Sequence, residues 1–202
     1  MFFVIIRLAF GMLAFGMCFF LIKKSHLIHK RKWCFVSFLT TVILITVSAL
    51  IPLENVFVTF SSPESAYNYN HFGNVRMVVH GKRTDFVVGE QNDTNIYAIV
   101  LKSDSGWKLG MGLDTKRIVQ TISDGVTIYV YQYKNTKDYY ITVLDTNGGS
   151  LEITDRYGAK FQCLETVNST LNKTFYTYYA SINNFDDQYT LNVNDNMIIV
   201  KN

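Results

Sequence analysis

The sequence predicts a two-helix transmembrane hairpin followed by a mainly-β, sandwich-like extracytoplasmic domain with one short helix. Charge is segregated, since all 16 Asp and Glu residues lie at or after Glu54, whereas residues 1–53 carry six basic side chains and no acid. Hydrophobic residues make up 49% of the chain and charged residues only 17%, while about a quarter of a soluble domain is charged. All 13 tyrosines lie beyond residue 53. This composition excludes a disordered chain and a disulfide-stapled miniprotein.

Two apolar segments predict the membrane helices. Residues 1–22 are apolar except for Arg7, and residues 34–53 contain no charge. A helix of about 20 residues spans about 30 Å, the hydrocarbon thickness of a bilayer. Arg7 is discordant, but an arginine near a helix end can extend to the interface. We therefore expect transmembrane helices over 1–22 and 34–53.

A basic loop over 23–33 predicts the orientation of the hairpin. Its cations are Lys23, Lys24, Lys30, Arg31 and Lys32. Short loops rich in Lys and Arg stay on the cytoplasmic side, so we expect a two-span protein of the cell membrane with residues 54–202 outside. The same loop should contact anionic membrane lipid. An alternative is an internal signal sequence that is cleaved near Val47-Ser48-Ala49.

After one predicted helix, residues 54–202 show a pattern of short strands separated by turns. Ser62 can cap that helix, Pro63 suits its first position, Glu64 complements its dipole and Gly73 offers a stop. Short β-branched and aromatic runs then alternate with Asn, Asp and Gly. The predicted strands are roughly 75–80, 84–90, 96–102, 107–111, 117–122, 126–133, 138–145, 151–155, 159–166, 174–182, 188–193 and 196–200. We expect a sandwich-like region with possible subunits at 54–115 and 117–202.

Four short motifs of the sequence resemble those of a known protein family. They are Ser61-Ser62-Pro63-Glu64-Ser65-Ala66-Tyr67, Ser105-Gly106-Trp107-Lys108, Asp138-Tyr139-Tyr140 and Asn184-Phe185-Asp186-Asp187-Gln188-Tyr189-Thr190-Leu191. With them the chain resembles an uncharacterised family of membrane-tethered surface proteins of low-GC Gram-positive bacteria. The resemblance implies a cell-surface location and no known activity.

The sequence offers little catalytic chemistry. Asp145-Thr146-Asn147-Gly148 departs from the Asp-Thr-Gly loop of aspartic proteases and has no second copy, so a hairpin turn is the better interpretation. Cys163 alternates with Phe161, which predicts a buried thiol on a strand face. We expect no catalytic residues, no metal and no cofactor. The alternative is a surface hydrolase that uses carboxylates such as Glu90, Asp93 or Asp145.

An aromatic row predicts a binding face instead. Tyr129, Tyr131 and Tyr133 share one face of a predicted strand, and Ile128 and Val130 take the other. If the aliphatic face is core, the tyrosines form an exposed row suited to sugars or a protein partner. The alternative is a partly buried cross-strand ladder with hydroxyl groups at the rim.

The predicted function is a non-catalytic, membrane-anchored binding module whose partner is an envelope protein or a wall component. The region after residue 53 is net negative, which disfavours nucleic acid as a partner. A related alternative is an accessory or sensory subunit whose two helices pair with those of a membrane complex. Gly11 and Gly16 could permit close helix packing, although they are five residues apart and miss the four-residue glycine spacing.

Overall fold

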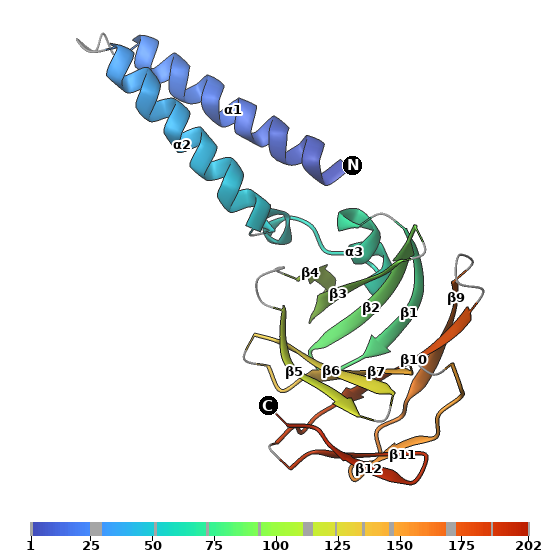
Figure 1. The fold of residues 1–202 in the computed structure, drawn as a ribbon. Coiled ribbons are helices and arrows are strands. Elements are labelled where there is room, and N and C mark those ends of the chain that lie inside the picture. The colour runs from blue at the N-terminus through green and yellow to red at the C-terminus, as the bar shows by residue number, and fades with distance from the viewer. Residues whose placement is uncertain are drawn as a thin grey trace. The chain divides into compact units, whose positions relative to one another are not determined.

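A computed structural model shows two compact units, a hairpin unit (Met1–Val58) and a β unit (Thr59–Asn202) (Figure 1). Strands hold 51% of the structure, and three α-helices and one 3₁₀ helix accompany them in the described residues. The structure describes residues 2–24, 30–50, 52–71, 73–92, 94–110, 115–123, 125–134, 136–145, 148–168, 173–186 and 188–201.

The hairpin unit consists of α1 (Phe2–Lys24), α2 (Lys30–Leu50) and the short 3₁₀ helix η1 (Leu53–Val56). The two long helices pack against each other along their length (Figure 1). Both segments that the sequence predicts as helical are therefore helices, and the second begins at the basic residues of the predicted loop. Residues 25–29 lie outside the described residues.

The prediction that this hairpin crosses a membrane is wrong. Within the described part of the chain, no helix combines the length and the apolar character that a membrane span requires. Arg7 limits the charge-free part of α1 to 8–22, and three cations at the start of α2 limit it to 33–50. The first stretch is shorter than the roughly 17–25 apolar residues of a typical span, and the second lies at the lower end of that range. The predicted two-span location in the cell membrane is corrected by the same finding, and the fold is mainly β with short helices.

The β unit begins with α3 (Pro63–Asn70) and continues as antiparallel strands. As predicted, the Ser62 side chain caps α3 by accepting a hydrogen bond from the Ser65 backbone N–H at 3.1 Å. The strands are β1 (Asn74–His80), β2 (Thr84–Gln91), β3 (Thr94–Ser103), β4 (Gly106–Leu109), β5 (Thr115–Ser123), β6 (Val126–Tyr133), β7 (Tyr139–Asp145), β8 (Ile153–Asp155), β9 (Gln162–Asn168), β10 (Lys173–Ile182), β11 (Thr190–Val193) and β12 (Asn196–Ile199). Each predicted strand is confirmed, with shifts of a few residues at the ends.

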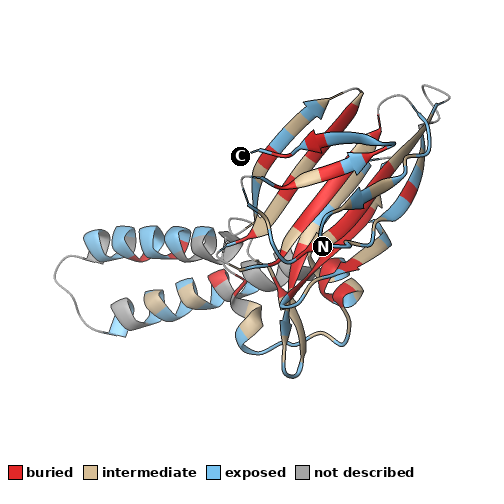
Figure 2. Ribbon diagram, turned by 90° about the horizontal axis from the view of Figure 1, so that it is seen from below, coloured by how far each residue is buried: buried red, intermediate tan, exposed pale blue. Residues whose placement is uncertain are grey.

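These strands form three sheets, which we call A, B and C. Sheet A has the order β1-β2-β3-β4, sheet B the order β5-β6-β7-β10-β9, and sheet C the order β12-β11-β8. The central strands of sheet B, β6 and β7, are mostly buried, and Figure 2 marks the buried residues of the chain in red. Ile128 and Val130 of β6 join a core cluster with Leu191 of sheet C. Tyr133, on the opposite face of the same strand, joins a second cluster with Phe86 of sheet A.

A third cluster lies between α3 and the outer face of sheet A. Ala66 and Tyr67 of α3 pack there on Val87 and Val100. Gly89 allows this close approach, because a Cβ atom at that position would overlap the ring and hydroxyl group of Tyr67. The α3 helix therefore needs a residue without a side chain beneath it.

One buried carboxylate joins sheets A and B. Asp138, 2% exposed, accepts hydrogen bonds from the backbone N–H groups of Lys82 at 3.2 Å, Arg83 at 2.6 Å and Thr84 at 2.8 Å. It also accepts one from the Thr84 hydroxyl at 2.9 Å, and that hydroxyl lies 2.7 Å from the Tyr140 hydroxyl. The turn between β1 and β2 is thereby fixed to the start of β7.

Candidate interaction surface on the helical hairpin

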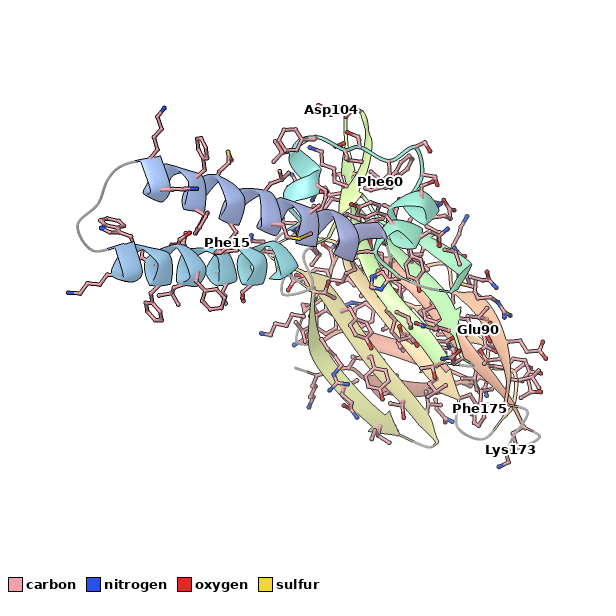
Figure 3. The ribbon with its side chains drawn as sticks, turned by 90° about the horizontal axis from the view of Figure 1, so that it is seen from above. Phe15, Phe60, Glu90, Asp104, Lys173 and Phe175 are labelled. Carbon is pink, nitrogen blue, oxygen red and sulfur yellow. The ribbon has the colours of Figure 1, made fainter. Side chains whose placement is uncertain are left out.

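The large apolar side chains of the hairpin that the structure describes are turned outward. Its buried positions include the small or hydroxyl-bearing residues Gly11, Ser37 and Thr41. The Thr41 hydroxyl donates to the Ser37 carbonyl at 2.9 Å, one turn back on the same helix. Figure 3 shows the side chains along both helices. The exposed large apolar residues of α1 and α2 are Met12, Leu13, Phe15, Met17, Phe19, Phe20, Trp33, Phe35, Val36, Phe38, Leu39, Val42 and Ile43.

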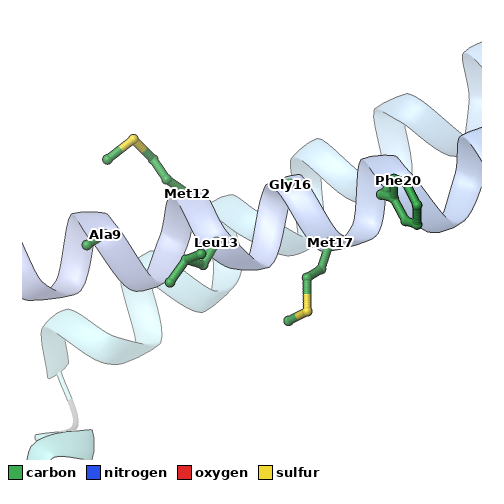
Figure 4. Close-up of a pocket in the computed structure, with 6 residues that line it drawn as sticks. All are labelled: Ala9, Met12, Leu13, Gly16, Met17 and Phe20. Atoms are coloured by element: carbon green, nitrogen blue, oxygen red, sulfur yellow. The ribbon is translucent and has the colours of Figure 1, made fainter.

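Six of the residues on α1 line one open groove of about 670 Å³ (Figure 4). We call this set the α1 stripe: Ala9, Met12, Leu13, Gly16, Met17 and Phe20. Their spacing of three and four residues places them on one broad face of the helix, with Met12 at one edge and Met17 at the other. The stripe therefore extends along the helix axis.

The α1 stripe combines exposed large residues with small ones. Met12, Leu13, Met17 and Phe20 are 69%, 64%, 66% and 64% exposed. At Gly16, a built Cβ atom would meet no other atom within 4 Å. Contiguous exposed apolar patches of this size mark surfaces that bind another apolar surface. Methionine side chains are flexible and adapt to the shape of a binding partner.

The loop end of the hairpin is basic. Lys23 and Lys24 end α1 and are exposed, as is Lys32 in the first turn of α2. Lys30 and Arg31 also belong to that first turn, but their side chains lie outside the described set. The role of these five cations as membrane-orienting residues required two spanning helices, which the described chain lacks. What the structure shows is a cationic end beside an apolar face.

The predicted tyrosine row lies between sheets B and A. Tyr129 and Tyr131 are half-buried and Tyr133 is 5% exposed, so the burial matches the partly buried ladder. Burial, and next the neighbouring Tyr97, raise the pKa of Tyr131 to about 12. The guanidinium of Arg117 lies 5.3 Å from the centre of the Tyr129 ring. A ligand-binding role for the row stays a prediction.

The carboxylates of the hydrolase alternative have structural partners. Glu90 forms an ion pair with Arg76 across β1 and β2. Asp145 is 1% exposed, accepts a hydrogen bond from the Gly149 backbone N–H, and borders a cavity of about 180 Å³. Asp93 lies outside the described residues. A hydrolase activity stays a prediction, and the described side chains include no group of three or more His, Cys, Asp or Glu placed to hold a metal ion.

Cys163 is exposed, so the prediction of a buried thiol is wrong. Its strand, β9, is an edge strand of sheet B and pairs only with β10 among the described strands. The alternation of Phe161 and Cys163 suggested a covered face, but covering also requires a second layer above the edge. Sequence periodicity does not report that layer.

Comparison with known proteins finds no relative. No family model matches the sequence, and no similar protein is found among curated proteins or solved structures. The resemblance to membrane-tethered surface proteins stays a prediction.

The α1 stripe could not be singled out from the sequence, because a helix that is apolar all round gives no amphipathic signal. A weaker signal was present, since the small residues Ala9 and Gly16 are seven apart and therefore share a face. Gly11 and Gly16, the two glycines considered from the sequence, lie on different faces of α1. Gly11 is buried and Gly16 is exposed.

Proposed function

We propose that this chain is a non-catalytic interaction module whose helical hairpin binds an apolar helix of a partner protein. The α1 stripe carries the proposal, because it is an exposed apolar surface that extends along a helix axis. Helices pack by placing the side-chain ridges of one into the grooves of another. An apolar helix in a groove is also a common recognition mode, with anchors at the same three- and four-residue spacing.

Charge makes the two ends of this surface different. Neither α1 nor α2 contains an acidic residue, and the exposed cations gather at the loop end. These cations would attract and orient a probe helix that carries acidic residues near that end. Of the partner classes expected from the sequence, a protein with an apolar helix fits this surface better than a wall component.

The β unit supplies a stable folded body in this proposal. Its large apolar residues are used in three internal clusters, between sheets B and C, between sheets A and B, and under α3. Its exposed large apolar residues are scattered across its strands and turns: Tyr97, Ile122, Tyr157, Val167, Met197 and Ile199. Partner binding is therefore assigned to the hairpin.

A labelled synthetic helix tests this assignment with the full-length protein. The probe is a fluorescent peptide with leucines at helical spacing and glutamates at one end, followed by fluorescence anisotropy. We expect Leu13→Gln with Met17→Gln to weaken binding about tenfold or more, which corresponds to at least about 1.4 kcal/mol. Glutamine removes the apolar contacts and keeps a good helix propensity.

Ile122→Gln is the matched control, because Ile122 is 70% exposed but lies on β5. It should change the affinity less than twofold. Equal binding of the probe by all three proteins, or no binding by the unmodified protein, would contradict the proposal.

A further inference from the structure

We propose that the helix received by the α1 stripe is the α1 helix of a second copy of this chain, running antiparallel. The inference rests on the proposed function, since it names the partner of the same surface. It follows from three properties of the stripe, namely its spacing, the sizes of its residues and the charges beyond its ends.

The spacing of the stripe is symmetric about its own midpoint. A two-fold axis through that midpoint, perpendicular to α1, brings each stripe residue of one copy to the same level along the helix as a stripe residue of the other. These pairs are Ala9 with Phe20, Leu13 with Gly16, and Met12 with Met17 of the second copy. At about 100° per residue, Ala9 and Phe20 lie at the middle of the stripe and face each other, whereas Met12 and Met17 lie on its two flanks. An interface of this kind is isologous, because both copies use the same patch.

The sizes of the facing residues are complementary in this antiparallel pair. The large Phe20 meets the small Ala9, and Leu13 meets the open hollow at Gly16, where a Cβ atom would find no neighbour within 4 Å. A parallel pair would place each residue opposite itself. Phe20 would then face Phe20 and Gly16 would face Gly16, which crowds one level of the interface and leaves another empty.

The charges also favour the antiparallel direction. The 23 residues of α1, at a rise of about 1.5 Å each, separate the two ends by about 35 Å. An antiparallel pair therefore keeps the two basic loops far beyond the Debye length of about 10 Å at 0.1 M salt. A parallel pair would place the lysines that end α1 beside their counterparts, and would also align the helix dipoles.

The exposed area indicates that α2 takes part as well. A side chain as large as Phe offers roughly 150–250 Å², so four stripe residues about two-thirds exposed provide about 400–600 Å² per copy. A stable interface uses about 800 Å² per partner. The exposed apolar residues of α2 include Phe35 and Phe38, and they can supply the remainder in a bundle of four helices.

Cysteine cross-linking tests the pairing directly. In a background with Cys18→Ser, Cys34→Ser and Cys163→Ser, one full-length protein carries Ala9→Cys and another carries Phe20→Cys. Antiparallel pairing brings these two positions together only between unlike chains, and disulfides form only at short Cα separations. On oxidation in detergent-free buffer, the mixture should give about tenfold more covalent dimer than either protein alone.

The second measurement exchanges the sizes of the residues at positions 13 and 16 and follows dimerisation. Gly16→Leu fills the hollow that Leu13 of the second copy would occupy, and should weaken dimerisation about tenfold or more in sedimentation equilibrium. Leu13→Gly combined with Gly16→Leu exchanges large and small, so the dimer should recover. Thermal unfolding should show that both variants remain folded, since the Gly16 position is open in the single chain.

Three outcomes would overturn the inference. They are cross-linking that is strongest from one variant alone, a chain that stays monomeric in buffer, and a chain that disperses as a monomer in lipid vesicles without the mixed cross-link. If the synthetic peptide still binds the stripe in those cases, only the identity of the partner is wrong. If the peptide also fails to bind, the proposed function fails with it.

Discussion

Raising the pH from 10 to 11 should destabilise the β unit by about 4 kcal/mol. Burial is the largest cause of a raised pKa at Tyr131, Tyr140, Tyr179 and Tyr189, and it brings the pKa of Tyr131 to about 12. Because the folded pKa exceeds the unfolded value near 10, the stability contribution is complete below pH 10. It is lost as the pH rises toward the folded pKa, at about 1.4 kcal/mol per pH unit for each phenol.

Urea unfolding at a series of pH values measures this loss. Tyr179→Phe removes one of the four phenols, so the slope of stability against pH above pH 10 should fall by about 1.4 kcal/mol per unit. Absorbance at 295 nm reports phenol ionisation in the folded protein. If these four tyrosines ionise near pH 10 while the protein stays folded, the described burial is wrong.

Replacing Asp138 by Ala should destabilise the β unit by roughly 3–5 kcal/mol, in the range for breaking a buried charged network. The substitution leaves three successive backbone N–H groups without their acceptor at the junction of sheets A and B. Buried donors without a partner cost roughly 1–3 kcal/mol each. Urea unfolding followed by circular dichroism measures the change.

Asp138→Asn tests whether the charge of the Asp138 side chain matters beyond its size and shape. The amide keeps the size of the carboxyl group but turns a donor toward a site that supplies donors, so its loss should approach that of Asp138→Ala. Asp104→Asn is the control, because Asp104 is exposed in the turn after β3 (Figure 3), and it should change stability by less than about 0.5 kcal/mol. A wild-type stability for Asp138→Asn would mean that the carboxylate does not fix the junction.

The strands of the β unit were predictable from the sequence because their signals are local. β6 runs over the predicted 126–133, where alternating Ile128, Val130 and tyrosines give the period of two directly. The α3 helix was equally clear, since Ser62 and Pro63 specify its start through their own backbone chemistry. Both cases need only neighbours along the chain.

The long-range packing was not predictable in the same way. The partial burial of the tyrosine row depends on sheet A lying over sheet B, and the exposure of Cys163 depends on β9 being an edge. The link from Asp138 to the turn at Lys82 joins residues that are 56 positions apart. The prediction of membrane spans failed for a more local reason, because Arg7 shortens the charge-free stretch of α1 and no described helix has the length and apolar character of a span.

Methionine oxidation tests most directly whether the α1 stripe is covered by an apolar partner. Met12, Met17 and Met197 are 69%, 66% and 75% exposed in the single chain, and Met197 lies on β12 in the β unit. With dilute peroxide in detergent-free buffer, we expect Met12 and Met17 to oxidise about tenfold more slowly than Met197 at high protein concentration. Their rates should approach that of Met197 on dilution or in the Gly16→Leu variant. Equal rates for the three methionines at every concentration would contradict this expectation.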